Sequence, residues 1–260
     1  MRLPIYQIDA FTNRVFGGNP AAVVPLGEWL PDAVLQSIAA ENNLAETAFV
    51  IPVDGDCPMR WFTPTVEVDL CGHATLAAAD VLLREYFPSR STITFTSRSG
   101  PLTVAREHGR LVMDFPSRPG EAIQPPDTLI AALDGMVIHH TRLARDLVVV
   151  LESEEAVRSF QPDFGRLAAV DAFAVVLTAP GNAVDFVSRF FAPNAGIPED
   201  PVTGSSHCTL IPYWAARLGR PVLTARQLSR RGGTLYCELA GNRVRIGGTA
   251  VEYLRGEIQV

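Results

Sequence analysis

One carboxylate of this chain, Glu46, stands where a general acid or base could work. It opens a predicted strand over 47–51, and its neighbours on both sides are apolar. Burial among such residues would raise the pKa of the carboxyl group toward the range useful for acid–base chemistry. A solvated or salt-bridged glutamate at a strand end is the ordinary alternative. Spacing alone does not separate Glu46 from three other carboxylates, Glu41, Glu67 and Glu199.

Two predicted helices begin at a glycine within a polar cluster. The two starts read Gly72-His73-Ala74 and Gly204-Ser205-Ser206. A helix that begins in this way presents unpaired amide groups and the positive end of its dipole. Both starts are therefore candidates for binding carboxylate or carbonyl oxygens of a substrate. The alternative is ordinary capping of each helix by a side chain, for which Asp69, Thr203 and Ser205 are available.

The surroundings of these two glycines form an internal repeat. RWFTP at 60–64 and RFFAP at 189–193 share arginine, phenylalanine and proline at the same spacing. In each copy a glutamate follows, and the glycine stands five residues after that glutamate. The shared order, the shared spacing and the helix after each glycine favour a duplication over two unrelated turns. A duplication predicts two similar domains, each about half of the chain.

The remaining patterns predict helices of unusual composition and many short strands. The stretches 75–86 and 209–218 are apolar nearly all round, which is typical of a helix buried on every side. A third helix is expected over 31–42. Short β-rich runs separated by turn residues predict an antiparallel meander. These runs are 21–24, 47–51, 92–96, 111–115, 147–151, 173–177, 243–246 and 257–260. The proline-rich segment 116–127 is the predicted interdomain linker.

Composition narrows the class of protein. The chain has 260 residues, 47% hydrophobic and 19% charged, which is a globular balance and not that of a disordered chain. A formal net charge of −6 argues against partners such as nucleic acid or anionic membranes. No apolar run approaches the roughly 18 residues of a membrane span, and the first residues lack a signal-peptide pattern. We therefore expect a cytoplasmic protein whose four cysteines are free thiols.

Four motifs together resemble the PhzF-like phenazine-biosynthesis family of the diaminopimelate-epimerase-like superfamily. They are CGHAT at 71–75, EDPVTGS at 199–205, the opening segment 9–21 and NLAETAF at 43–49. The resemblance implies an α+β, diaminopimelate-epimerase-like fold. Such a fold has two pseudo-symmetric lobes, each with a curled, mainly antiparallel sheet around a central helix, and an active site between the lobes. We expect one lobe over 1–117, completed by the last strand at about 250–260, and the other over 118–249.

The resemblance also implies functional residues. The proton-transferring glutamate of the family corresponds to Glu46, and its site histidine, aspartate and serine correspond to His73, Asp200 and Ser205. In the phenazine enzyme this glutamate moves a proton between carbons of a dihydro-hydroxyanthranilate. The residues expected to contact substrate are Cys71, Gly72, Ala74, Gly204 and Ser206. The resemblance further implies a homodimer with no cofactor and no metal, so we predict a cofactor-independent isomerase acting on a small anionic substrate.

Other functions remain open at this point. The related epimerases use two cysteines on opposite faces of a substrate carbon. Cys71 stands where the first would be, but its repeat partner Thr203 does not ionise near neutral pH. An amino-acid racemase or epimerase in which Glu46 replaces one thiol is an alternative, and so is a non-catalytic binding protein on the same scaffold. A metal site is a further alternative, because Cys71, His73, His207 and Cys208 are of types that bind metal ions. The Cys-Gly-His spacing is, however, unlike common zinc patterns.

Overall fold

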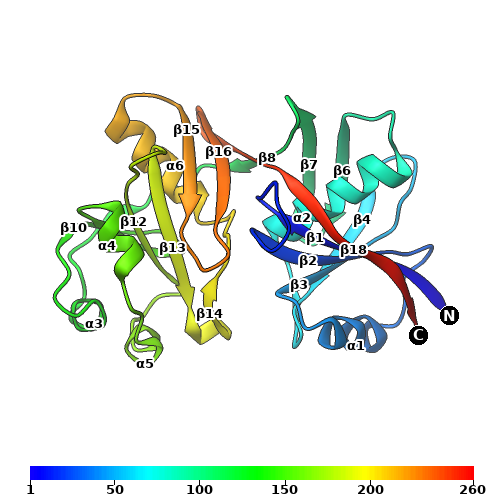
Figure 1. Ribbon diagram of the computed structural model, residues 1–260, viewed down its shortest axis with the longest axis horizontal. Coiled ribbons are helices and arrows are strands. Elements are labelled where there is room, and N and C mark those ends of the chain that lie inside the picture. The colour runs from blue at the N-terminus through cyan, green and yellow to red at the C-terminus, as the bar shows by residue number, and fades with distance from the viewer. The chain divides into compact units, whose positions relative to one another are not determined.

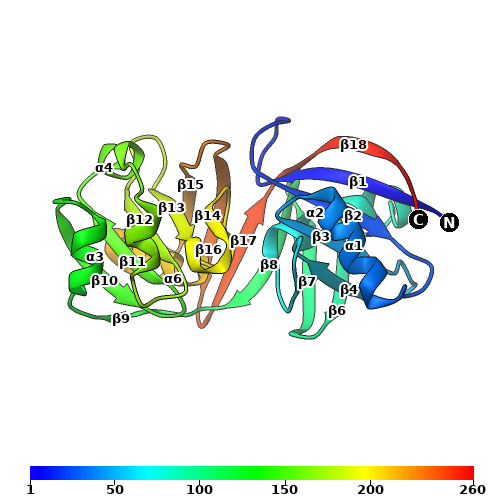
Figure 2. The same ribbon diagram turned by 90° about the horizontal axis from the view of Figure 1, so that it is seen from below.

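The computed structural model describes residues 1–260, which form two units (Figures 1 and 2). Unit 1 comprises Met1–Asp114 and Gly247–Val260, and unit 2 comprises Phe115–Ile246. The chain passes from unit 1 into unit 2 within strand β8 (Arg110–Pro116) and returns within β17 (Arg243–Gly248). The lobes expected from the sequence end at 117 and 249, whereas the units divide after 114 and 246.

Unit 1 is built on strands that pair mainly antiparallel. They are β1 (Arg2–Ala10), β2 (Asn19–Pro25), β3 (Glu46–Val50), β4 (Cys57–Phe62), β5 (Glu67–Val68), β6 (Thr92–Ser97), β7 (Gly100–Glu107), β8 and β18 (Ala250–Gln259). β1 pairs antiparallel with both β18 and β2, and β3 pairs antiparallel with β4. β2 and β3 are parallel, because helix α1 (Asp32–Asn42) crosses between them.

Unit 2 repeats this plan with more helices on its connections. Its strands are β9 (Glu121–Ala122), β10 (Ile138–Leu143), β11 (Leu147–Leu151), β12 (Val175–Pro180), β13 (Phe186–Ala192), β14 (Ile197–Asp200), β15 (Val222–Gln227), β16 (Gly233–Ala240) and β17. Its helices are α3 (Asp127–Ala132), α4 (Glu154–Ser159), α5 (Phe164–Ala168), the 3₁₀ turn η2 (Pro193–Ala195) and α6 (His207–Leu218). α3, α4 and α5 pack their apolar side chains onto one core with β11, β12 and β13.

The duplication predicted from the sequence repeat extends to the strand pairing. In unit 1 the pairs β1–β2, β2–β3 and β3–β4 are antiparallel, parallel and antiparallel. In unit 2 the pairs β10–β11, β11–β12 and β12–β13 follow the same order. β4 then pairs antiparallel with β5 and parallel with β6, as β13 does with β14 and β15. Helices α2 (Gly72–Val81) and α6 follow β5 and β14 at equivalent places.

The expectation of a simple antiparallel meander is wrong. Four of the pairs just described are parallel, and a parallel pair needs a crossover rather than a tight turn. Period-2 patterning reports which side chains share a face and carries no information on strand direction. The connection between β11 and β12 runs through α4 and α5, two short helices that the sequence patterns did not predict.

The three predicted helices are present with shifted starts. The stretch 75–86 is α2, continued by the π-helical turn η1 (Leu82–Tyr86), and 209–218 is the body of α6. Relative to these apolar stretches the helices begin three and two residues earlier, so α2 begins at the predicted Gly72 and α6 begins at His207, three residues after Gly204. The helix expected over 31–42 is α1, which ends where Asn43 adopts a left-handed conformation.

Helix α2 is the centre of unit 1. Every residue from His73 to Ala79 is buried, and the helix packs against β1, β2, β3, β7 and β18 (Figure 1). α1 lies on the other face of the sheet, where Leu35 and Ile38 pack with Phe49 and Phe62. The sheet of unit 1 therefore has one face turned to α2 and one turned to α1, and this division decides where each strand residue points.

The arginine and glutamate of the repeat form the same ion pair in both units. Arg60 donates two hydrogen bonds of 2.7 Å to Glu67, and Arg189 donates two of 2.7 and 3.0 Å to Glu199. We call each of these two-bond arginine–glutamate pairs an arginine fork. One fork joins β4 to β5 and the other joins β13 to β14, and the second strand of each pair leads into the buried helix. Arg189 is buried and also donates to the carbonyl groups of Val157 and Phe160.

The proline-rich segment 116–127 is not the crossing between the units. It belongs to unit 2 and contains β9, which pairs with β10. None of the helices combines the length and the apolar character that crossing a membrane requires.

We expect Arg189→Met to destabilise the protein by about 3 kcal/mol, because it removes one partner of a buried charge pair. The control is Arg158→Met, which breaks an exposed i,i+4 pair with Glu154 in the same unit and should cost less than about 1 kcal/mol. Urea unfolding followed by the fluorescence of Trp214, which is buried in unit 2, measures both variants. Equal losses in the two variants would contradict the structural role of the Arg189 fork.

Candidate active site

Strand alternation places Glu46 on the α2 face of the sheet. Glu46 is the first residue of β3, and Phe49 on the same strand packs on the α1 side. Successive side chains of a strand point to opposite faces, so Glu46 and Ala48 share the face that carries α2. The first turn of α2 brings His73 to this carboxylate.

None of the other three candidate glutamates contacts a histidine. Glu67 and Glu199 are held by the two arginine forks, and Glu41 is exposed on α1. Of the four glutamates that the sequence could not separate, Glu46 is the one that faces a second titratable group suited to proton transfer. This distinction comes from tertiary contacts that spacing does not encode.

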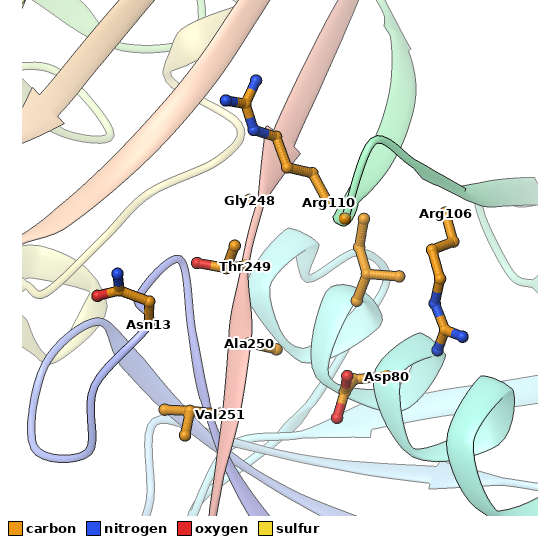
Figure 3. A pocket seen from close by; sticks show the side chains of 10 residues that line it. Asn13, Asp80, Arg106, Arg110, Gly248, Thr249, Ala250 and Val251 are labelled. Atoms are coloured by element: carbon orange, nitrogen blue, oxygen red, sulfur yellow. The ribbon is translucent and has the colours of Figure 1, made fainter.

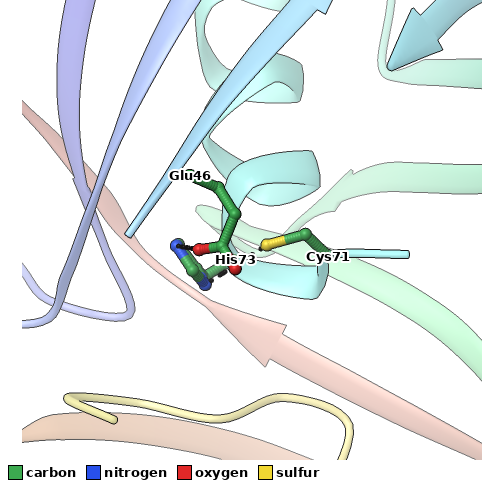
Figure 4. Close-up of side chains that lie close together, drawn as sticks. All are labelled: Glu46, Cys71 and His73. Atoms are coloured by element: carbon green, nitrogen blue, oxygen red, sulfur yellow. Dashed lines mark hydrogen bonds and ion pairs between the residues drawn. The ribbon is translucent and has the colours of Figure 1, made fainter. Parts of the chain in front are cut away.

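Glu46, Cys71 and His73 form one buried cluster (Figure 4). Oε2 of Glu46 lies 3.1 Å from Nε2 of His73, and their side chains are only 12% and 7% exposed. Neither of these two atoms has a well-directed hydrogen bond. Sγ of Cys71 lies 3.5 Å from Nδ1 of His73, on the other side of the ring. The imidazole is thus placed between a carboxylate and a thiol.

Asn19 is a further member of this cluster that the residue-by-residue prediction missed. Its Nδ2 lies 3.2 Å from Nδ1 of His73, and the residue is completely buried. The preceding Gly18 has φ +62°, and a Cβ there would lie 2.1 Å from the carbonyl oxygen of Ala10. Only glycine fits this turn, so Gly18 fixes the position from which Asn19 reaches the histidine. Both residues belong to the opening motif that carries the family resemblance.

The charges of the cluster are those of an ion pair. Burial by itself would raise the pKa of Glu46, but the charge and hydrogen bonding of His73 outweigh burial and lower it. Burial would lower the pKa of His73, but Cys71 and Glu46 raise it well above its ordinary value. The expectation that burial would raise the pKa of Glu46 is therefore wrong, because a partner 3.1 Å away stabilises the carboxylate.

Cys71 is a neutral thiol in this setting. Burial, together with the negative charge of Glu46, raises its pKa to about 11. It is the residue that precedes α2, and its carbonyl group accepts hydrogen bonds from the amide and the hydroxyl of Thr75. Because a thiol with this pKa stays protonated near neutral pH, the charge that keeps His73 protonated comes from Glu46.

Asp200 belongs to a separate polar cluster within unit 2. The hydroxyl of Thr203 donates to its Oδ2, and Gln227 holds the same loop by two hydrogen bonds, one from the Thr203 amide to Oε1 and one from Nε2 to the Asp200 carbonyl. Gln227 is completely buried and was not predicted as a site residue. It lies on β15, far from the loop in sequence, so nothing in the local pattern pointed to it.

The residues before α6 form a turn without a side-chain cap. Ser206 precedes the helix and donates its hydroxyl to the Thr203 carbonyl, while Ser205 is half-buried. At α2 the residue before the helix, Cys71, makes no capping bond either. Side-chain capping by Asp69, Thr203 or Ser205, the alternative considered from the sequence, is absent at both helices. Gly72 and Ala74 accordingly lie in the first turn of α2, where the first amide groups have no intrahelical partner, whereas Gly204 lies in the turn that precedes α6.

His207 is a buried neutral histidine. It is the first residue of α6, and its Nδ1 lies 2.8 Å from the Thr203 carbonyl oxygen, to which it donates. Burial lowers its pKa to about 4. His108, His139 and His140 are exposed.

Glu46 has no carboxylate equivalent in the second copy of the repeat. Thr47 on β3 pairs with Phe62, and Val175 on β12 pairs with Phe191. Since Phe62 and Phe191 are repeat equivalents, the position of Glu46 is occupied in unit 2 by Ala174. Thr203 likewise replaces Cys71, and Ser205 replaces His73. The carboxylate–imidazole pair of unit 1 therefore has no equivalent in unit 2.

A cavity of about 260 Å³ lies elsewhere in unit 1 (Figure 3). Asp80 on α2 and Arg106 on β7 lie on its wall, with residues of β18. Asp80 is eight residues along α2 from Gly72, which corresponds to about 12 Å along the helix axis. This cavity is separate from the Glu46 cluster.

Comparison with known proteins places the chain among relatives over its whole length. Residues 8–256 match the family model described as phenazine biosynthesis-like protein. An uncharacterized isomerase of Pseudomonas aeruginosa is 49% identical over 260 residues, which is 100% of both chains. The crystal structure of a PhzF-family phenazine biosynthesis protein from Enterococcus faecalis superposes with a TM-score of 0.97 at 50% identity, covering 100% of both chains.

A more distant structure shares the fold alone. The hydroxyproline epimerase of Agrobacterium vitis superposes with a TM-score of 0.60 at 12% identity, covering 99% of this chain and 92% of the epimerase. With these two structural likenesses, the predicted α+β, epimerase-like fold is confirmed.

We expect Glu46→Gln to lower the pKa of His73. The substitution removes the carboxylate that keeps the imidazole protonated and leaves burial, which favours the neutral ring. Two-dimensional ¹H–¹⁵N spectra of the histidine side chains measure the titration, and Glu41→Gln serves as the control. In the unmodified protein the pair should stabilise the fold most between about pH 4.5 and 6.5, because the Glu46 contribution is lost as pH falls and the His73 contribution as pH rises. An unchanged His73 titration in Glu46→Gln would contradict the ion pair.

The buried neutral His207 should make the protein sensitive to acid. Its folded pKa of about 4 lies below the ordinary 6.5, so the unfolded chain binds a proton first and stability falls between these two pH values. The loss from this group is about 3 kcal/mol. Unfolding free energies across this window should fall less in His207→Gln, whose amide can still donate to the Thr203 carbonyl. Parallel curves for the two proteins would show that His207 is not buried as a neutral ring.

Proposed function

Because the chain belongs to the phenazine biosynthesis-like family and is an isomerase, we propose that it moves a proton between two carbons of a small anionic substrate, with Glu46 as general acid and base. One carboxylate can accept a proton from one carbon and return it at another without a redox step. The observation that carries this proposal is the buried contact of 3.1 Å between Glu46 and His73.

The ion pair supports both halves of such a reaction. Glu46 is ionised in the free protein, as a base must be before it removes a proton. His73 carries the positive charge that can stabilise the negative charge developing on the substrate. The unsatisfied Oε2 and Nε2 atoms leave both groups able to turn toward a bound molecule.

An anionic substrate would also adjust the strength of the base. In the free protein His73 lowers the pKa of Glu46, which makes the carboxylate a weak proton acceptor. A second negative charge beside the pair would raise the pKa of Glu46 and share the positive charge of His73. Substrate binding would thereby bring the carboxylate closer to the basicity that proton transfer from carbon needs.

Two residues of unit 2 complete the proposal on the strength of family resemblance. Asp200 and Ser205 are proposed as further functional residues, and the amide groups at Gly72 and Gly204 as binding groups for substrate oxygens. Hydrogen bonds from Thr203 and Gln227 fix the loop around Asp200. A functional carboxylate has to be held in position in this way.

The structure offers little support for a two-thiol racemase. The raised pKa of Cys71 makes it a poor thiolate base, and Thr203 uses its hydroxyl to donate to Asp200. A single carboxylate with an imidazolium partner suits transfer of one proton between two positions better than removal and return on opposite faces.

Proton exchange in D₂O tests the assignment of Glu46. Two probes suffice: a dihydro-hydroxyanthranilate, on which the phenazine enzyme of the family acts, and trans-4-hydroxy-L-proline, the ligand bound to the Agrobacterium epimerase. NMR should find deuterium at carbon in the first probe when the unmodified protein is present. In Glu46→Gln the rate of deuterium incorporation should fall by about 100-fold or more. Glu41→Gln, an exposed glutamate of the same unit, should exchange like the unmodified protein.

The outcomes separate the candidate functions. Exchange that persists in Glu46→Gln rules out this residue as the base. Inversion of hydroxyproline would favour the epimerase, and binding of either probe without any exchange would favour a non-catalytic binding protein.

A further inference from the structure

The Glu46 cluster also has the composition of a transition-metal site. One donor atom each from Glu46, Cys71 and His73 lies within 4.8 Å of the other two. Carboxylate oxygen, thiolate sulfur and imidazole nitrogen are the three donor types that bind Zn²⁺ in proteins. The metal site considered from the sequence combined Cys71 and His73 with His207 and Cys208. It did not include the carboxylate of Glu46.

The spacing requires only small movements for coordination. Tetrahedral zinc with bonds of about 2.0–2.3 Å holds its donor atoms about 3.4–3.6 Å apart. The donor atoms lie within 4.8 Å of one another, so the most distant pair would approach by at most about 1.4 Å, a movement that side-chain rotation can supply. Three protein donors leave a fourth position open, as in zinc sites that bind an exchangeable water or anion.

The surroundings would hold these donors in place. Cys71 and His73 are two residues apart at the start of the buried helix α2, so their backbones are fixed by the core of unit 1. Oε2 of Glu46 and Nε2 of His73 are buried without a directed hydrogen bond. The ion would take one nitrogen of the ring, which must turn about its Cβ–Cγ bond so that this nitrogen faces both Glu46 and Cys71.

We propose that Glu46, Cys71 and His73 bind Zn²⁺ and that the bound ion inhibits the isomerase. Binding displaces the thiol proton of Cys71 and the proton that His73 carries in the ion pair, and both protons pass to solvent. The metal is an inhibitor here and not a cofactor, because coordination occupies the carboxylate that must accept the substrate proton. Binding itself follows from the three donors alone, whereas inhibition rests on the proposed role of Glu46. Mg²⁺ should have no such effect, since it prefers oxygen donors in octahedral geometry.

Cobalt(II) is the probe that tests binding without any turnover. Co²⁺ takes the place of zinc in tetrahedral sites, and a cysteine ligand produces a thiolate-to-cobalt charge-transfer band in the near ultraviolet. We expect the metal-free protein to develop this band with one equivalent of Co²⁺ and to lose it when Zn²⁺ is added. Cys71→Ser should lack the band, and Cys57→Ser, which changes another buried cysteine of unit 1, should keep it.

Inhibition is measured separately by the deuterium-exchange assay. Zn²⁺ should reduce exchange by about 100-fold or more, a chelator should restore it, and Mg²⁺ should leave it unchanged. No cobalt band in the unmodified protein, or an equal band in Cys71→Ser, overturns the metal site whatever the exchange assay shows. A band that depends on Cys71, in a protein whose exchange survives Glu46→Gln, supports the metal site and refutes the proposed role of Glu46 instead.

Discussion

The buried contact between Glu46 and His73 is the interaction around which unit 1 is organised. A carboxylate and an imidazole are costly to remove from water separately, and each is tolerated here because the other is 3.1 Å away. Their meeting requires that β3 begin beside the first turn of α2. It also requires that α2 be surrounded by sheet, which its nearly uniform apolar composition ensures.

Two opposing effects set the protonation of this pair, and their balance has a chemical consequence. Burial favours the neutral forms of both groups, whereas their mutual attraction favours the charged forms, and attraction prevails. The carboxylate is therefore ready to act as a base but is a weak one until another negative charge approaches. The closeness of these groups underlies both proposals: proton transfer by Glu46 with His73, and binding of a metal ion by these two residues together with Cys71.

The two copies of the duplicated unit have diverged in chemistry while keeping their frame. The arginine forks of Arg60 and Arg189 hold equivalent strands in both units. At the helix starts, however, the first copy has Cys71 and His73 where the second has Thr203 and Ser205, and Ala174 stands in place of Glu46. The ion-pair frame is insensitive to these exchanges because the fork lies on the strands and not at the helix mouths.

The sequence by itself determined the repeat, the two buried helices and eight of the eighteen strands, because these depend on residue order and local periodicity. It also determined, through family motifs, the list of candidate site residues. Only the tertiary structure decided which glutamate meets His73, since Glu41, Glu46, Glu67 and Glu199 differ in their distant partners and not in their local patterns. The parallel strand pairs, the contacts of Asn19 and Gln227 and the lowered pKa of Glu46 were beyond the sequence for the same reason. Each arises between residues that are far apart in the chain and become neighbours only when the strands of their unit pair into a sheet.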